Sequence, residues 1–139
     1  MTTSRPEESM SHGDAITAPF WAGAREGRLL LQRCARCGAH QFYPRPFCLA
    51  CDHDTLTWEA AAGTGVVYSR TEVHVKVRED LVPPYTVAVV ALDEGPRLTT
   101  LIVDGAGDPG AGCEIGDPVE VLWRARADAP PLPVFKRSA

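Results

Sequence analysis

Two cysteine pairs, Cys34-Ala35-Arg36-Cys37 and Cys48-Leu49-Ala50-Cys51, separated by ten residues, decide the fold of the first third of this chain. Two residues between paired thiolates let one tight turn present both sulfurs to a single ion, and a second turn completes a tetrahedron. Four thiolates leave no position for water or substrate, so the four cysteines predict a structural zinc site. Iron bound by four thiolates is the main alternative. Two CxxC pairs at this spacing favour a metal over redox chemistry.

Strand-like segments surround the cysteine pairs, at residues 28–33, 41–43 and 56–60. Before them, the sequence predicts a short helix over residues 17–27, which Thr17 can cap and Gly27 can end in the left-handed region. This helix has an apolar face made of Phe20, Trp21 and Ala24. We expect the face to pack within its own domain, with docking on a partner protein as the alternative.

The remainder of the chain favours a small β-barrel. Apolar and alternating segments separated by Gly and Pro predict strands at 66–77, 85–93, 97–104 and 118–126, with a glycine-rich loop over 105–112. So many short strands close more readily into a barrel than they form an open sheet. The expected organisation is therefore mainly β: a disordered segment at 1–16, a helix and metal-binding unit at 17–60, and a barrel with its tail at 61–139.

Composition excludes some classes of protein and limits others. The 139 residues carry a net charge of −4, which argues weakly against a non-specific nucleic-acid binder. The sequence has no apolar run of about 18 residues, so neither a transmembrane helix nor a membrane partner is expected. The first 20 residues are polar and lack the apolar core of a secretion signal. Because paired cysteines that bind a metal suit a reducing compartment, we predict a cytoplasmic protein.

The remaining reactive side chains do not form a recognisable catalytic set. Cys113 is followed by Glu114, which disfavours a thiolate, so an ordinary free thiol is expected there. His40 and His53 lie beside the cysteine pairs, where four sulfurs already complete a metal shell. His74 has no Asp or Ser partner at a recognisable spacing. We therefore expect a protein that is not an enzyme by itself.

The order of motifs along the chain is more specific than any one of them. Helix residues Pro19-Phe20-Trp21 precede Cys34-Ala35-Arg36-Cys37-Gly38, Pro44-Arg45-Pro46-Phe47-Cys48, Gly63-Thr64-Gly65-Val66-Val67-Tyr68-Ser69 and Gly116-Asp117-Pro118. Over residues 17–135 this pattern resembles the zinc-ribbon plus OB-fold family of acyl-CoA-associated proteins, long catalogued as a domain of unknown function. The resemblance implies an N-terminal helical segment, a rubredoxin-like zinc ribbon and a C-terminal OB-fold barrel.

The resemblance also implies a function. Members of the family act as non-catalytic partners of thiolase-like enzymes, among them thiolases, aldolases and acyltransferases, and some accompany MaoC-type hydratases. They are thought to stabilise the enzyme and to help bind or channel its acyl-CoA substrate. This chain is short and has no fused hydratase domain, so its resemblance to the family implies a separate catalytic polypeptide and a hetero-oligomer.

Arginines near the cysteines are the candidate contacts for CoA. Arg33, Arg36 and Arg45 flank the metal site, and guanidinium groups suit the phosphates of CoA. A zinc ion bound by four thiolates carries a net charge of −2, so neutralisation of that charge is an equal alternative. A further alternative function is binding of single-stranded nucleic acid by the barrel, which offers Tyr68, Tyr85 and Trp123 for stacking.

Overall fold

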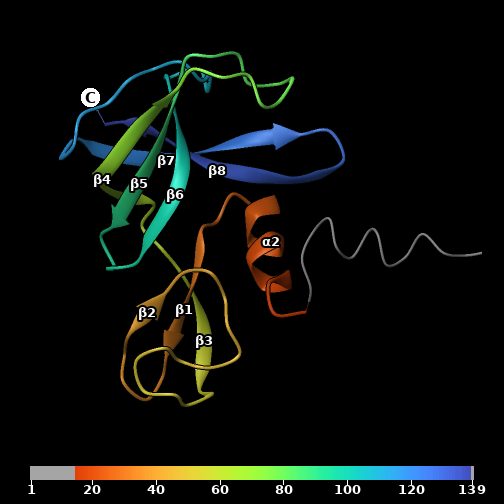
Figure 1. Ribbon diagram of the computed structural model, residues 1–139. Helices are drawn as coiled ribbons and strands as arrows, with labels where there is room; N and C mark the ends of the chain where they lie inside the picture. Colours follow the sequence, from red (N-terminus) through yellow and green to blue (C-terminus); the bar gives the residue numbers. More distant parts are fainter. Residues whose placement is uncertain (1–14, 139) are drawn as a thin grey trace, which may run out of the picture. The chain divides into compact units, whose positions relative to one another are not determined.

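The computed structural model describes residues 15–138, which form two compact units (Figure 1). The described part of the first unit runs to Ala61 and includes residues 125–132, and the second unit contains residues 62–124 and 133–138. The expected mainly β architecture is confirmed, with one helix and eight strands in the described part of the chain. The disorder expected over residues 1–16 falls almost wholly outside the described residues. No helix among them is long and apolar enough to cross a membrane.

The first unit is built on a three-stranded antiparallel sheet in the order β2-β1-β3. Its strands are β1 (Leu30–Cys34), β2 (His40–Gln41) and β3 (Leu56–Ala60). The central strand β1 pairs with β3 over its full length, from Leu30 opposite Ala60 to Cys34 opposite Leu56. This pairing places the first cysteine at the end of a fixed strand.

Helix α2 (Ala18–Arg25) agrees with the short helix expected from the sequence. Thr17 occupies the N-cap position, but its side chain makes no capping hydrogen bond. Gly27, at φ 75°, ends the helix as expected. Phe20 and Ala24 are buried, and the Phe20 ring meets the Trp21 and Phe42 rings edge to face, at centroid distances of 4.9 and 5.6 Å. The apolar face therefore packs within its own unit, as we expected.

The second unit contains most of a closed five-stranded barrel in the order β4-β5-β6-β8-β7, and the adjoining ends of β7 and β8 fall within residues 125–132 of the first unit. Its strands are β4 (Thr64–Val73), β5 (Tyr85–Leu92), β6 (Arg97–Val103), β7 (Pro118–Arg126) and β8 (Ala129–Arg137). Neighbouring strands β4–β5, β5–β6 and β4–β7 are antiparallel, whereas β6 and β8 are parallel. Closure removes the open edges that a sheet of this size would expose, and the predicted small barrel is confirmed.

The strand expected over residues 66–77 is too long at its C-terminal end. Strand β4 stops at Val73, and Val75 and Val77 are each 67% exposed. The alternating pattern predicted a strand from local sequence, but the pairing of β4 with β5 ends at Val73.

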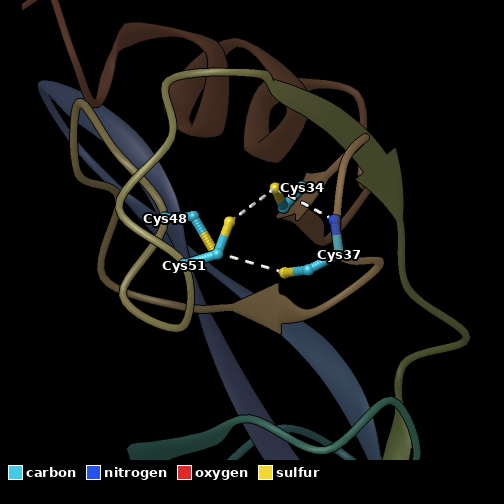
Figure 2. A group of neighbouring side chains, drawn as sticks. All are labelled: Cys34, Cys37, Cys48 and Cys51. Atoms are coloured by element: carbon cyan, nitrogen blue, oxygen red, sulfur yellow. Dashed lines mark hydrogen bonds between the residues drawn. The ribbon is translucent and has the colours of Figure 1, made fainter.

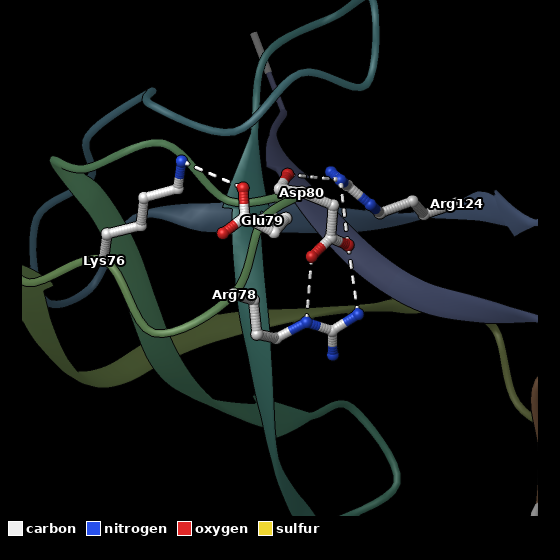
Figure 3. Close-up of polar contacts among 5 residues, drawn as sticks. All are labelled: Lys76, Arg78, Glu79, Asp80 and Arg124. Atoms are coloured by element: carbon white, nitrogen blue, oxygen red, sulfur yellow. Dashed lines mark hydrogen bonds and ion pairs between the residues drawn. The ribbon is translucent and has the colours of Figure 1, made fainter.

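The segment after β4 is held by an ion-pair cluster instead of a strand ladder (Figure 3). The Arg78 guanidinium donates two hydrogen bonds, of 2.9 and 3.0 Å, to the Asp80 carboxylate. Arg124 on β7 donates to the Asp80 carbonyl at 3.2 Å. Hydrogen bonding from Arg78, with the charge of Arg124 adding to it, lowers the pKa of the Asp80 carboxyl.

Strand β8 was missed because its sequence contains three prolines, which cannot donate to a strand ladder. The parallel pairing with β6 begins at Phe135, opposite Ile102, after the last of these prolines. Phe135 and Val134 are almost fully buried, so they contribute to the core of the barrel. Burial of these side chains and pairing with β6 outweigh the poor strand propensity of the prolines.

The Gly63-Thr64-Gly65 motif has a steric explanation where the barrel closes between β4 and β7. Gly63 adopts φ 82°, a conformation that side-chain-bearing residues rarely take. A Cβ atom on Gly65 would lie 2.3 Å from the carbonyl oxygen of Ala91, inside the β4–β5 ladder. Gly65 therefore allows close approach of a neighbouring backbone, whereas Gly63 is favoured by its φ and by the Val121 side chain, whose Cγ1 atom a Cβ would approach to 2.8 Å.

We predict that Gly65→Ala destabilises the barrel by about 1–3 kcal/mol, because the ladder must shift to admit the methyl group. Thermal unfolding followed by circular dichroism should show a Tm lower by about 5–10 °C. Gly105→Ala is the matched control, since a Cβ there meets no heavy atom within 4 Å. Equal Tm values for the two variants would contradict the steric explanation.

Candidate metal centre

The sulfur atoms of Cys34, Cys37, Cys48 and Cys51 converge on one point in the first unit (Figure 2). All four lie within 4.8 Å of one another, and the Cys34–Cys51 and Cys37–Cys48 pairs are each 3.6 Å apart. Zn–S bonds of about 2.3 Å in a tetrahedron require S···S distances of about 3.8 Å. A disulfide would require about 2.05 Å. The donor set and its spacing therefore fit a four-coordinate metal ion.

The two cysteine pairs adopt the same turn. The amide of Cys34 donates to the carbonyl of Ala39 at 2.9 Å, and the amide of Cys48 donates to that of His53 at 2.8 Å. Within each turn, the residue after the second cysteine donates back to the first cysteine's carbonyl, from Gly38 and Asp52. Both residues have positive φ, 79° and 67°. From the sequence, a positive φ could be predicted only at Gly38. Asp52 also adopts the left-handed region, but an aspartate does not by itself predict this conformation.

Hydrogen bonds to sulfur prepare the site for a cation. The amide of Cys37 donates to Cys34 Sγ at 3.5 Å, and the amide of Ala50 donates to Cys48 Sγ at 3.3 Å. The Cys37 amide, followed by the Thr55 hydroxyl, lowers the pKa of the Cys34 thiol to about 6. The His53 backbone bond favours the Cys51 thiolate, but burial and the bonds to the other cysteine sulfurs outweigh it and raise the pKa of the Cys51 thiol to about 12. Because metals bind thiolates, donors that favour the charged sulfur also favour metal binding.

A pair of buried glutamines orders the segment that carries the second cysteine pair. Gln32 on β1 and Gln41 on β2 lie opposite each other, and Gln41 Nε2 donates to Gln32 Oε1 at 2.8 Å. Gln32 also bonds both the amide and the carbonyl of Arg45, each at 2.9 Å. Gln41 accepts from the amide of Leu49 at 3.0 Å and donates to the carbonyl of Phe47 at 3.3 Å. These contacts fix residues 43–49, which we call the ribbon loop.

Sequence reasoning missed this network. A single glutamine on a strand normally indicates a solvated face, yet here Gln32 is 5% and Gln41 8% exposed. Gln32 stands two residues before Cys34 and Gln41 four residues after Cys37, and these unequal spacings do not mark the two glutamines as partners. Such spacing has no general meaning without the sheet register.

The three candidate arginines lie in different settings around the metal site. Arg33 Nη1 is 3.8 Å from Glu59 on β3, at the surface. Arg45 Nε donates to the carbonyl of Tyr43 at 3.4 Å, and Arg36 is exposed within the first turn. The structure thus leaves the guanidinium groups of all three at least partly accessible to an anion.

The histidines beside the cysteine pairs bond to other groups. His40 Nε2 donates to Glu59 at 2.7 Å, and this bond, with Arg33 adding to it, lowers the pKa of the Glu59 carboxyl. His53 Nδ1 donates to the carbonyl of Cys51 at 2.9 Å. Both interactions support the surface of the ribbon and leave the sulfur tetrahedron as the metal-binding group.

Cys113 lies in the second unit at a surface cavity of about 350 Å³. Its lining also contains Arg70, Glu72, Glu114 and Arg137, and no histidine that could act as a base. Burial raises the pKa of the Cys113 thiol, and this thiol is 6% exposed. A buried thiol with a raised pKa and no histidine beside it is a poor nucleophile, which agrees with the expectation of an ordinary free thiol.

Two family descriptions match adjacent segments of the chain. A ChsH2 rubredoxin-like zinc ribbon domain matches residues 21–57. A ChsH2 C-terminal OB-fold domain matches residues 58–124. Together they cover the C-terminal part of α2, the metal site and the barrel without β8 and the end of β7.

Individual relatives agree with these matches. The chain is 34% identical over 114 residues to a DUF35 domain-containing scaffold protein of Methanocaldococcus jannaschii, covering 80% of this chain and 79% of that protein. It is 39% identical over 136 residues to a probable enoyl-CoA hydratase alpha subunit of Thermomonospora curvata, covering 95% of this chain but only 40% of that protein. A solved chain described as Ltp2-ChsH2(DUF35) aldolase superposes with a TM-score of 0.80 at 35% identity, covering 91% of this chain and 98% of that chain.

We predict that the purified protein contains one zinc ion per chain, and that Cys37→Ser loses it because three thiolates bind the ion much more weakly. Metal content by plasma mass spectrometry and circular dichroism after chelation should show loss of the ion together with loss of ribbon structure. Cys113→Ser is the control and should keep a full complement of metal. A wild-type protein that holds neither zinc nor iron, and that a chelator does not perturb, would contradict the prediction.

We also predict that Gln41→Leu speeds metal release about 10-fold, because it leaves the Leu49 amide and the Phe47 carbonyl without their partners. An unsatisfied buried polar group costs about 1–3 kcal/mol. The rate of zinc transfer to a colorimetric chelator measures the effect. Thr57→Val serves as the control, since it removes a 3.3 Å side-chain bond to the Arg33 carbonyl that lies away from the ribbon loop. Similar rates for both variants would show that the glutamines do not support the metal site.

Proposed function

The chain belongs to the family of DUF35-domain proteins that join a ChsH2-type zinc ribbon to an OB-fold domain, and on that premise we propose that it is a non-catalytic accessory subunit of a thiolase-superfamily enzyme. In this role it stabilises the enzyme and helps bind or channel its acyl-CoA substrate. The observation that carries the proposal is the similarity to a solved chain described as Ltp2-ChsH2(DUF35) aldolase, which covers 91% of this chain and 98% of that chain.

The chemistry of the described residues supports an accessory role. The metal site is a closed set of four sulfurs, which holds structure and offers no position for a substrate. The thiol at the cavity of the second unit is buried, burial raises its pKa, and the lining of that cavity contains no histidine. Catalysis by this assembly would therefore come from the partner enzyme.

Contact with the CoA phosphates is the proposed role of the arginines around the metal site. Arg36 is the strongest of the three candidates because it is exposed in a turn that the metal holds rigid. Arg33 shares its charge with Glu59, and Arg45 donates to a backbone carbonyl. Guanidinium groups on a rigid support bind phosphate oxygens with good geometry.

A second candidate partner is a MaoC-type enoyl-CoA hydratase. The supporting observation is the 39% identity to a protein named as a probable enoyl-CoA hydratase alpha subunit, of which this chain spans 40%. The same scaffold would then serve a hydratase domain or subunit instead of a thiolase-like enzyme. The acyl-CoA substrate class would be the same in both cases.

Binding of single-stranded nucleic acid is less well supported. Of the three aromatic residues considered for stacking, Tyr85 is 4% exposed and Trp123 is only partly exposed. Tyr68 is 51% exposed, but the Arg97 guanidinium covers its ring at 3.9 Å. Nucleic-acid-binding barrels offer several free aromatic faces in a basic groove.

We predict a stable complex when the chain is coexpressed with a thiolase-superfamily protein from the same genome, and no acyl-CoA turnover by the chain alone. Gel filtration and turnover assays test these points. Within the complex, Arg36→Gln should weaken CoA binding about 10-fold, since a charge-assisted hydrogen bond contributes about 1.5–3 kcal/mol. Arg28→Gln, which removes an exposed arginine that pairs with Glu26 outside the metal turns, is the control. A complex only with a hydratase from the same genome would favour the second candidate, and failure with both would refute the accessory role.

A further inference from the structure

The ribbon loop displays apolar side chains to solvent. Tyr43 is 51%, Phe47 44% and Leu49 54% exposed, and all three lie within seven residues of one another. Large apolar side chains gathered on one exposed segment are a sign of an interaction surface. Aromatic residues are enriched at such surfaces, because they bury much area at a small cost in conformational entropy.

This exposure belongs to an ordered segment. The buried pair Gln32 and Gln41 bonds the backbone of the ribbon loop at Arg45, Phe47 and Leu49. Cys48, which is fully buried, ties the same loop to the sulfur cluster. Ordering a loop during association costs free energy, and a loop that is already ordered avoids that cost.

The backbone at Tyr43 adds an independent observation. Its φ is 53°, in the left-handed region that bulky residues rarely adopt and that Gly or Asn would occupy with less strain. Such strain tends to persist where the side chain has a function. Here the strained residue presents an exposed aromatic ring, at a centroid distance of 4.7 Å from the ring of Phe42.

Charge identifies the chemistry of the complementary surface. Arg45 lies between Tyr43 and Phe47 in the loop, is exposed, and its Nε donates to the Tyr43 carbonyl at 3.4 Å. Tyrosine and arginine are the residues most enriched among those that dominate binding energy at protein interfaces. A partner that covers this loop therefore needs an apolar pocket bordered by carboxylates.

We propose that the ribbon loop is the docking surface for the catalytic subunit, which receives Tyr43, Phe47 and Leu49 in an apolar pocket and pairs an Asp or Glu with Arg45. This inference rests on the proposed function and deepens it, since it assigns the partner to one surface of the chain. It also separates the arginines: Arg45 binds the protein partner, and Arg36 remains available for phosphate.

The test uses the complex with the coexpressed thiolase-superfamily enzyme. Tyr43→Asn removes the ring and places at φ 53° a residue that tolerates this conformation, so the variant should fold at least as well as the wild type. The dissociation constant, measured by titration calorimetry, should rise at least 10-fold. Adding Leu49→Ser should raise it about 100-fold, while thermal stability and zinc content stay at wild-type values.

The control is the double variant Val75→Ser/Ile115→Ser. These residues are 67% and 68% exposed in the second unit, so the control removes a comparable exposed apolar surface from elsewhere. Its dissociation constant should equal that of the wild type. Arg45→Gln should slow association and reduce its dependence on salt, as expected for a charge at the rim of an interface.

The outcomes separate this inference from the proposed function. If the wild type binds the enzyme and Tyr43→Asn/Leu49→Ser binds equally well, the docking surface is wrong and the accessory role stands. An equal loss of affinity in the control would also overturn the assignment. If the loop variants instead abolish self-association of the chain in gel filtration, the occupant is a second copy and not the enzyme. If the wild type binds neither candidate enzyme, the proposed function and this inference fail together.

Discussion

The convergence of four thiolates on one point is the constraint on which the first unit depends. Its sheet has only three strands, one of them two residues long, and a single eight-residue helix. An apolar core of this size gives little stability, and small units usually need a metal or disulfides. The two cysteine turns supply that support, because each is closed by backbone hydrogen bonds and the ion joins both. Metal binding and folding of the ribbon are consequently one equilibrium.

The two buried glutamines connect the first cysteine turn with the ribbon loop. Gln32 and Gln41 face each other across β1 and β2, so their positions depend on the sheet register that the first cysteine turn fixes. Their amides then bond three residues of the ribbon loop, and that loop delivers Cys48 back to the sulfur cluster. The first cysteine turn, the glutamine pair and the ribbon loop therefore depend on one another. The backbone of the ribbon loop is held by the same sheet that carries the first cysteine turn.

Patterns of neighbouring residues correctly predicted the features that depend only on residues close together in sequence. The cysteine spacing, the glycine that ends α2 and the strands β5, β6 and β7 all follow from residues close together in sequence. The ends of β4 and the existence of β8 depend instead on strand pairing between residues far apart in sequence. Residues 74–77 alternate like a strand but leave the ladder, whereas proline-containing β8 becomes a barrel strand because Phe135 is buried and pairs beside Ile102. The glutamine network was invisible for the same reason, since its partners lie 6–13 residues apart and meet only in the folded sheet.

A rigid, closed unit suits an accessory subunit better than it suits an enzyme. Catalytic metal sites keep a coordination position open, whereas four cysteines close this one. In the proposed accessory role, metal binding would help to hold the strained Tyr43 and the exposed side chains of Phe47 and Leu49 in place. Association then pays little to order these groups, so a small interface can still be specific. If the proposed role is correct, the metal contributes to it indirectly, by prearranging the surface that the partner enzyme would contact.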